Sequence, residues 1–527
     1  MDRTQRLTLV ATGLGLFMIF LDALIVNVAL PDIQRAFGVG EAGLQWVVAA
    51  YSLGMAVAIM SAATFADLHG RRLLYVIGVV VFTSASVACG LAPSLEVLNV
   101  ARGVQGVAAA TANVTSLALV SAAFPDPKQK ARAIGIWTAI ASVGTAVGPT
   151  LGGVLVEHVG WRSIFLVNVP FGVLVVWLTL AHVAESRDPR PRTLDGSGQL
   201  LFAATIGAFA YAVIAGPQAG WTSPLILALL AGAVLLAVLF VRAERASADP
   251  MMDVTLFRDA TYALAIVTIC AVLFAVYGML LLVTQYLQNV RGYTPQATGF
   301  MLLPFSASVT VVSPLVGRMV GRFGARPPIL AGLVVQIAGL CVLIAGAGGH
   351  TAFVLVGLLL AGTGGALCLT PITTLAMTSV PPARAGMASG IMSAQRAIGS
   401  TLGFAVLGSV LAAWLTATLA PDLAAVVPDP VERRAVAAAI VGSANPHAHV
   451  AEIGPRQPVG HRDPATAAAI VAVADRDFVQ GIRAGLGVAV GVLALVFLAA
   501  LRWFPRGGGA LLSEAQREEA KLARSET

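Results

Sequence analysis

Three formally charged side chains lie well inside apolar segments of the chain: Asp22, Arg102 and Arg396. Each costs about 2.5–3.5 kcal/mol on translocon-insertion scales, so a charge within a membrane helix indicates a functional site. An isolated aspartate in a dry site is protonated at pH 7, whereas a neighbouring arginine keeps it ionised. A carboxylate held between these two states can take up and release a proton. The alternative for each residue is a structural tie between helices.

Asp22 and Arg102 are expected at similar depths in the membrane. Asp22 lies eight residues before the end of its apolar segment near Leu30, about 12 Å from the outer face at the rise of an α-helix. Arg102 lies five or six residues into its own segment, about 8–9 Å deep by the same rise. The two side chains would therefore meet if the first and fourth helices pack together.

The composition of the chain is that of a membrane protein. Of its 527 residues 57% are hydrophobic and 11% are charged, and the mean hydropathy is +0.85. A soluble domain keeps about 25% charged residues to cover its surface. The cysteines lie in apolar runs without CxxC spacing, and the histidines are scattered, so we expect no disulfide and no metal site. His447 and His449 could bind a metal incidentally, but a plain loop is the better interpretation.

Breaking the sequence at charges and at Pro/Gly turns predicts fourteen membrane helices, each near the ~20 residues that a span requires. The predicted fold is therefore an all-α polytopic membrane protein. The spans are approximately 8–30, 44–66, 73–92, 97–120, 133–156, 164–183, 199–216, 224–241, 261–288, 296–317, 327–348, 351–379, 386–413 and 481–501.

Lys and Arg gather in alternate loops, beginning with Arg71 and Arg72, whereas the opposite short loops carry only Arg35, Arg162 and Arg291. Basic loops stay on the cytoplasmic side, so both termini are expected there. The net charge of +7 therefore follows membrane topology and does not predict a nucleic-acid partner.

A weak internal repeat divides the chain. ADLHGRR (Ala66–Arg72) follows the second span, GRFGAR (Gly321–Arg326) follows the tenth, and Gly70 aligns with Gly324. Matching loops are typical of a transporter built from two repeated halves. We expect six-helix halves at 1–183 and 261–501, a linker with two inserted helices at 184–260, and a cytoplasmic tail at 502–527. A long external loop is predicted at 415–477, with a short surface helix around Val431–Ile440.

The fifth span contains GTAVGPTLGG (Gly144–Gly153). Gly144, Gly148 and Gly152 recur at four-residue spacing and so lie on one helix face, which allows close helix packing. Pro149 interrupts the regular hydrogen-bond ladder of the helix. The full pattern, which ends in Gly153, is far more specific than a single GxxxG.

These motifs resemble those of the major facilitator superfamily, and within it the fourteen-helix drug:proton antiporters of the EmrB/QacA type. LDALIVNVALPDI (Leu21–Ile33) resembles the first-helix motif, and RGVQG (Arg102–Gly106) the helix-4 motif whose arginine is implicated in proton transfer. GTAVGPTLGG resembles the helix-5 motif of exporters, and ADLHGRR the loop 2–3 signature. The matching loop residues are Asp67, Gly70, Arg71 and Arg72.

WRSIFLVNVP (Trp161–Pro170) and SAQRAIGSTLGFAVLG (Ser393–Gly408) resemble further stretches of the fourteen-helix branch. The loop 2–3 signature departs from the family pattern, because Ala63 replaces its first glycine and Leu68 the arginine after its aspartate. That arginine would belong to a cytoplasmic charge latch, so the resemblance implies a weakened latch here.

The resemblance implies a major facilitator fold of two six-helix halves plus two inserted helices. It further implies efflux of lipophilic drugs or antibiotics by alternating access, driven by the proton gradient through Asp22 and Arg102. No GxxxxGK[ST] phosphate loop is present, so we expect no ATP and no cofactor. We expect a monomer in a bacterial cytoplasmic membrane, whose partners are lipid, protons and small substrates.

Asp22 is the only acid that we find within a predicted span, which favours neutral, zwitterionic or singly charged substrates. An importer of the same fold, a polytopic membrane enzyme and a non-transporting sensor are the alternatives. The helix-5 pattern argues against the importer, and the scattered histidines against the enzyme. Polar and aromatic residues within the spans are candidates for a substrate cavity: Asn27, Tyr51, Asn113, Trp137, Tyr277, Gln285 and Gln395.

Overall fold

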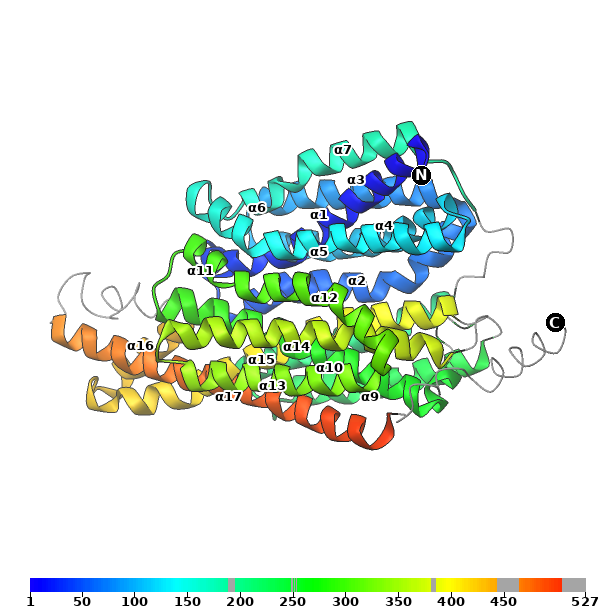
Figure 1. Cartoon of the computed structure of the whole chain (residues 1–527). Coiled ribbons are helices and arrows are strands. Elements are labelled where there is room, and N and C mark those ends of the chain that lie inside the picture. The colour runs from blue at the N-terminus through cyan, green and yellow to red at the C-terminus, as the bar shows by residue number, and fades with distance from the viewer. Residues whose placement is uncertain are drawn as a thin grey trace.

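The computed structural model describes residues 1–187, 195–247, 250, 252, 254–380, 385–442 and 464–504. In this part of the chain, thirteen helical segments are long and apolar enough to cross a membrane, and the two arms of one bent helix make a fourteenth. The predicted all-α polytopic fold is therefore confirmed. In Figure 1 the first half of the chain, blue to cyan, lies above the second half, green to red.

The first half contains six spans, the last of which is broken into two helices near Val167. Side chains of Asp2, Ser94 and Asp126 cap three of the helices by accepting hydrogen bonds from backbone N–H groups of the first turn. The elements are α1 (Arg3–Phe37), α2 (Glu41–His69), α3 (Arg71–Gly90), α4 (Leu95–Ala123), α5 (Pro127–His158), α6 (Ser163–Leu166) and α7 (Asn168–His182). The helix α2 is bent by 53° between its two arms, Gly43–Ile59 and Ser61–His69.

Two inserted helices, α8 (Gly196–Ala219) and α9 (Pro224–Ala246), follow the first half. α8 packs against α2 of the first half and against α15 of the second. The Ser409 hydroxyl of α15 donates to the Val213 carbonyl of α8 at 2.8 Å. The insert therefore covers one seam between the halves, while residues 188–194 of the predicted linker lie outside the described residues.

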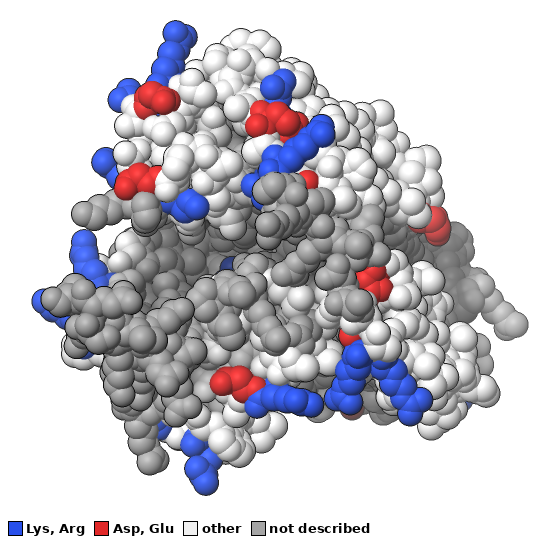
Figure 2. Space-filling view, turned by 90° about the vertical axis from the view of Figure 1, so that its right-hand side faces the viewer, with Lys and Arg blue, Asp and Glu red and all other residues white. Residues whose placement is uncertain are grey.

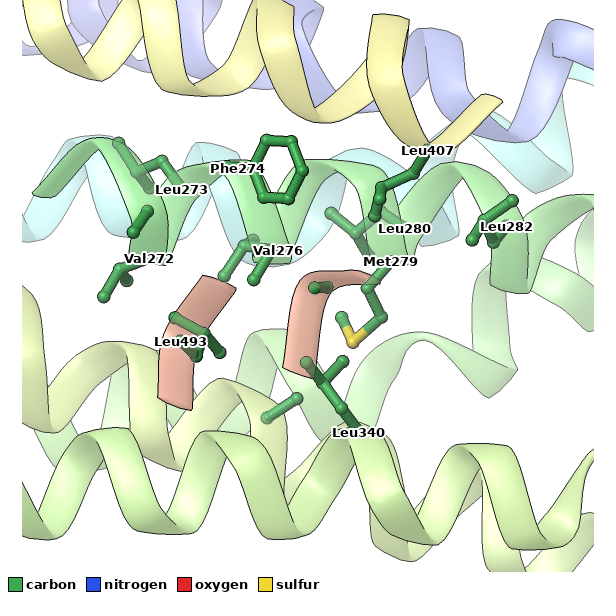
Figure 3. Close-up of a cluster of buried hydrophobic side chains, with 14 of the residues drawn as sticks. Val272, Leu273, Phe274, Val276, Met279, Leu280, Leu282, Leu340, Leu407 and Leu493 are labelled. Carbon is green, nitrogen blue, oxygen red and sulfur yellow. The ribbon is translucent and has the colours of Figure 1, made fainter. Parts of the chain in front are cut away.

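The second half is built around α10, which is apolar and buried on nearly every side. Figure 3 shows Val276 and Met279 of α10 among Leu340 of α13, Leu407 of α15 and Leu493 of α17. The elements are η1 (Val254–Arg258), α10 (Ala260–Gln285), the π-helical turn η2 (Tyr286–Val290), α11 (Pro295–Met301), α12 (Leu303–Phe323), α13 (Arg326–Gly346), α14 (Thr351–Thr378), α15 (Ala385–Asp422), η4 (Leu423–Ala425), α16 (Pro430–Gly442) and α17 (Pro464–Trp503).

The predicted external loop 415–477 is shorter than expected. α15 continues to Asp422 and α17 already begins at Pro464, because these alanine-rich stretches are good helix formers. An ion pair of 2.6 Å between Arg476 and Asp422 joins the two extensions. α16 matches the short helix expected around Val431–Ile440, but the structure buries one of its faces.

Residues 443–463, with His447 and His449, lie outside the described residues, as do residues 505–527 of the predicted tail. The expected boundaries between the halves and the insert stay predictions.

The two halves meet at the end of the bundle opposite the N-terminus. There α5 packs against α11 and α2 against α15, and the Gln288 amide donates to the Val28 carbonyl at 2.8 Å. At the other end, where α1 begins and α17 ends, Figure 2 shows a surface that is hollowed near its middle. The structure is therefore closed at one end and open at the other.

Candidate functional site

A buried ion pair joins α1 to α4. The Asp22 carboxylate and the Arg102 guanidinium are 2.6 Å apart, and neither residue is exposed to solvent. The structure thus brings together the two charges that were expected at similar depth. Ions of opposite charge without water interact strongly, but they need further hydrogen bonds to offset their desolvation.

Two amide side chains supply hydrogen bonds to Asp22, and a hydroxyl group holds both amides. The second carboxylate oxygen of Asp22 accepts from the Gln105 amide at 3.0 Å and from the Asn168 amide at 2.9 Å. Both amides also donate to the Ser86 hydroxyl, at 3.1 and 3.0 Å, and this hydroxyl donates to the Phe165 carbonyl at 2.8 Å. The Asp22 carboxylate of α1 is therefore held by side chains from α4 and α7, and Ser86 of α3 accepts from both of these amides.

Arg102 has partners of its own on α2 and α4. Its guanidinium donates to the Gln105 carbonyl oxygen at 2.7 Å and to the Val47 backbone carbonyl at 3.2 Å. Its Cζ lies 4.3 Å from the centre of the Tyr51 ring, which is cation–π distance. The network that surrounds Asp22 and Arg102 therefore links five helices of the first half, and we call it the ion-pair network.

Sequence reasoning missed three members of this network: Ser86, Gln105 and Asn168. A signal was present, because each is a polar residue within an apolar span, and Gln105 and Asn168 lie inside quoted motifs. Nothing in their spacing, however, indicates that residues 22, 86, 105 and 168 converge on one point.

The glycine face of α5 packs directly on α1, beside Asp22. A Cβ atom at Gly144 would lie 2.6 Å from the Phe17 carbonyl oxygen, and one at Gly152 would lie 2.9 Å from the Ile25 carbonyl oxygen. Gly148 lies between them, and a Cβ atom there would lie 3.3 Å from the Leu21 carbonyl oxygen. Only glycine lets the two backbones approach so closely, so α5 and α1 form a tight pair.

The α5 motif also reaches the other half of the molecule. The next residue, Gly153, lies against the backbone of Pro295 at the start of α11, and Gly299 of α11 lies against the Pro149 carbonyl. α5 therefore contacts both α1, which carries Asp22, and α11, which closes the structure on the side of the second half.

Gly144→Ala is expected to lower the thermal stability of the detergent-solubilised protein, because the new methyl group meets a backbone carbonyl. Overpacking of this kind costs about 1–3 kcal/mol. Gly135→Ala is the matched control on the same helix, since no atom lies within 4 Å of its Cβ position. Removing an interior helix glycine there should stabilise by about 0.5–1 kcal/mol. Equal melting temperatures for the two variants would contradict close packing of α5 on α1.

The loop 2–3 motif forms a local structure. Asp67 pairs with Arg71 at 2.8 Å, and Gly70 has φ of 118°, a conformation that side chains rarely adopt. The Glu185 carboxylate, which sequence reasoning missed, accepts from the backbone N–H groups of Arg72 at 2.9 Å and Leu73 at 3.2 Å. An acid at this position stabilises the positive end of the α3 dipole.

Gly324, which the repeat aligns with Gly70, also ends a helix with positive φ, at 77°. Both halves therefore have a glycine with positive φ at this helix end, although Gly321 stands where the second half would need the acid.

The residues expected to line a substrate cavity differ in how deeply the structure buries them. Asn27, Tyr51 and Gln285 are buried, and Tyr51 lies beneath Arg102. The other four candidates are half-buried, and Arg396 is exposed. The half-buried residues are Asn113, Trp137, Tyr277 and Gln395. A role in substrate binding stays a prediction for all seven.

Within the described residues no group of three His, Cys, Asp or Glu side chains could hold a metal ion. The two helical bundles, the hollow between them and a buried charge pair are the features of a secondary transporter. The chain belongs to the Major Facilitator Superfamily, whose family model matches residues 12–404. It is therefore a multi-pass membrane transporter and not an enzyme.

Several curated proteins are similar to this chain over nearly its whole length. A multidrug resistance protein, Stp, of Mycobacterium tuberculosis (strain CDC 1551 / Oshkosh) is 67% identical over 96% of this chain and 93% of its own length. The drug efflux pump JefA of the same organism is 46% identical over 96% of this chain and 99% of its own. The tetracenomycin C resistance and export protein of Streptomyces glaucescens is 34% identical over 95% of this chain and 91% of its own.

Among solved structures, a bacterial homologue of the human lysosomal transporter Spinster, in an inward-facing and unoccupied conformation, matches with a TM-score of 0.66. It is 19% identical, and the match covers 96% of this chain and 100% of that one. At this identity the likeness concerns the fold alone.

Proposed function

We propose that this chain exports lipophilic drugs or antibiotics across a bacterial cytoplasmic membrane in exchange for protons. The observation that carries the proposal is the ion pair of 2.6 Å between Asp22 and Arg102, buried beside the glycine face of α5. The similar proteins named for multidrug resistance, drug efflux and tetracenomycin C export support the direction of transport.

Asp22 is the proton carrier in this proposal. Protonation neutralises the carboxylate and weakens its attraction to Arg102, which then remains buried as an uncompensated charge. The ion-pair network therefore favours different packing of α1 against α4 in its two protonation states. Because α5 packs tightly on α1 and also on α11, a shift of α1 would be transmitted to the closed seam between the halves.

The open end faces the cytoplasm in this proposal. The N-terminus lies at that end, and the basic residues of the predicted inner loops support a cytoplasmic position for it. Substrate would enter the hollow from this side, and protonation of Asp22 from the outer side would favour the return to the inward-open state. The transporter works as a monomer without ATP or another cofactor, and the proton gradient supplies the energy.

Purified protein in liposomes with an imposed pH gradient tests the proposal. Lipophilic compounds from a panel are expected to drive proton movement opposite to their own, measured with a pH-sensitive dye inside the liposomes. Protein-free liposomes control for passive leak. Movement of compound and protons in the same direction would favour the importer, and compound transport without proton movement would rule out proton coupling.

A further inference from the structure

Arg396 differs from the other deep arginine of the chain in its surroundings. Arg102 is buried and paired with a carboxylate, whereas Arg396 is exposed and, among the described residues, forms no ion pair. Its guanidinium donates to the Thr373 hydroxyl of α14 at 2.9 Å. A guanidinium has five N–H donors, so most of its hydrogen-bonding capacity is left for other partners.

Arg396 lies eleven residues beyond Ala385, the first residue of α15, which is about 16 Å along the helix axis. It contacts α14 through Thr373, and Tyr277 of α10 is within electrostatic range. A charge this deep is stable only if it faces a water-filled space or a partner. Because the Arg396 side chain is exposed, we infer that it faces a water-filled space between the halves.

The surroundings of Arg396 extend to the ion-pair network. Tyr277 is half-buried and packs its ring on that of Phe404, with the ring centroids 5.6 Å apart. Tyr277 also packs against the buried apolar cluster of the first half that contains Leu21 and Ile25, the neighbours of Asp22 on α1. Tyr277 therefore packs between the second half, which carries Arg396, and the helix of the first half that carries Asp22.

The charges of Asp22 and Arg396 indicate whether the space between the halves would bind an anion or a cation. Asp22 is fully buried and already holds Arg102, Gln105 and Asn168, so it is not available to bind a cation from the hollow. Arg396 contributes an unneutralised positive charge to the same space. A guanidinium binds carboxylates and similar planar oxyanions through paired, charge-assisted hydrogen bonds.

We propose that Arg396 binds the anionic group of the exported compound and that Tyr277 contacts its planar apolar part. The substrate class is then a lipophilic aromatic anion, such as a carboxylate or an acidic phenolate. The proposal rests on the proposed export function and narrows the range of neutral, zwitterionic and singly charged compounds expected from the sequence.

Three probes with one ring system test the charge preference: 9-anthracenecarboxylate, its methyl ester and 9-(aminomethyl)anthracene. Their binding to the detergent-solubilised protein is measured by quenching of tryptophan fluorescence. The wild type is expected to bind the carboxylate about tenfold more tightly than the other two, the size of one charge-assisted hydrogen bond. Arg396→Gln is expected to lose this preference while binding the ester unchanged.

Arg291→Gln is the matched control, because Arg291 also donates to a threonine hydroxyl, that of Thr351, but lies at the outer end of the bundle. It should keep the wild-type preference. Arg396→Lys, which preserves the charge, should keep part of it and serves if the glutamine variant does not fold.

An equal affinity of the wild type for all three probes, or an unchanged preference in Arg396→Gln, would overturn the proposal. Either result would leave proton counterflow in liposomes intact, so failure of the anion site is distinguishable from failure of the export function.

Discussion

Asp22→Asn is expected to abolish substrate-driven proton counterflow in liposomes. Asparagine has nearly the shape of aspartate but cannot bind or release a proton, so the two protonation states that shift α1 against α4 are lost. Binding of lipophilic compounds should persist, because Asp22 is buried and does not face the hollow. The measurement compares compound binding by fluorescence with proton movement by an internal pH dye.

Asp32→Asn is the matched control for this prediction. Asp32 lies on the same helix and pairs with Arg35 at 2.7 Å, but both side chains are partly exposed. The control variant should transport protons as the wild type does. Full coupling in Asp22→Asn would show that another group carries the proton.

Arg102→Gln is expected to destabilise the protein far more than the double variant Asp22→Asn/Arg102→Gln. The single change leaves a carboxylate buried without a counter-charge, which costs about 3–5 kcal/mol. The double change leaves neutral amides that can still bond to Gln105 and Asn168. Thermal unfolding in detergent should therefore give a low melting temperature for the single variant and one near wild type for the double. Transport should be lost in both.

Arg71→Gln provides the comparison with a pair that is partly exposed to solvent, Asp67–Arg71, where about 0–1 kcal/mol is expected. If Arg102→Gln were no less stable than Arg71→Gln, the Asp22–Arg102 pair would not be a desolvated ion pair.

Helices within the membrane could be predicted more completely than the parts of helices that extend beyond it. The spans were predictable because burial in lipid requires a long apolar run wherever the helix sits. The ends of α15 and α17 were not, because outside the membrane the same apolar criterion no longer marks a helix. There, Asp422 and Arg476 look like loop residues until the ion pair between them is seen.

The sequence by itself determined the fourteen spans, the similar level of Asp22 and Arg102 along their helices and the glycine face of α5. Each of these follows from local composition and helix periodicity, which do not depend on the neighbours of the helix. Only the tertiary structure decided that Gln105 and Asn168 hold Asp22 and that Ser86 accepts from both amides. Hydrogen bonds act over about 3 Å, so residues far apart in sequence become partners only once their helices have packed.

The same reason separates the two deep arginines. In the sequence, Arg102 and Arg396 are equally isolated charges in apolar runs. Packing places Arg102 against a carboxylate and leaves Arg396 exposed beside Thr373, because the helices that surround them carry different side chains at those depths.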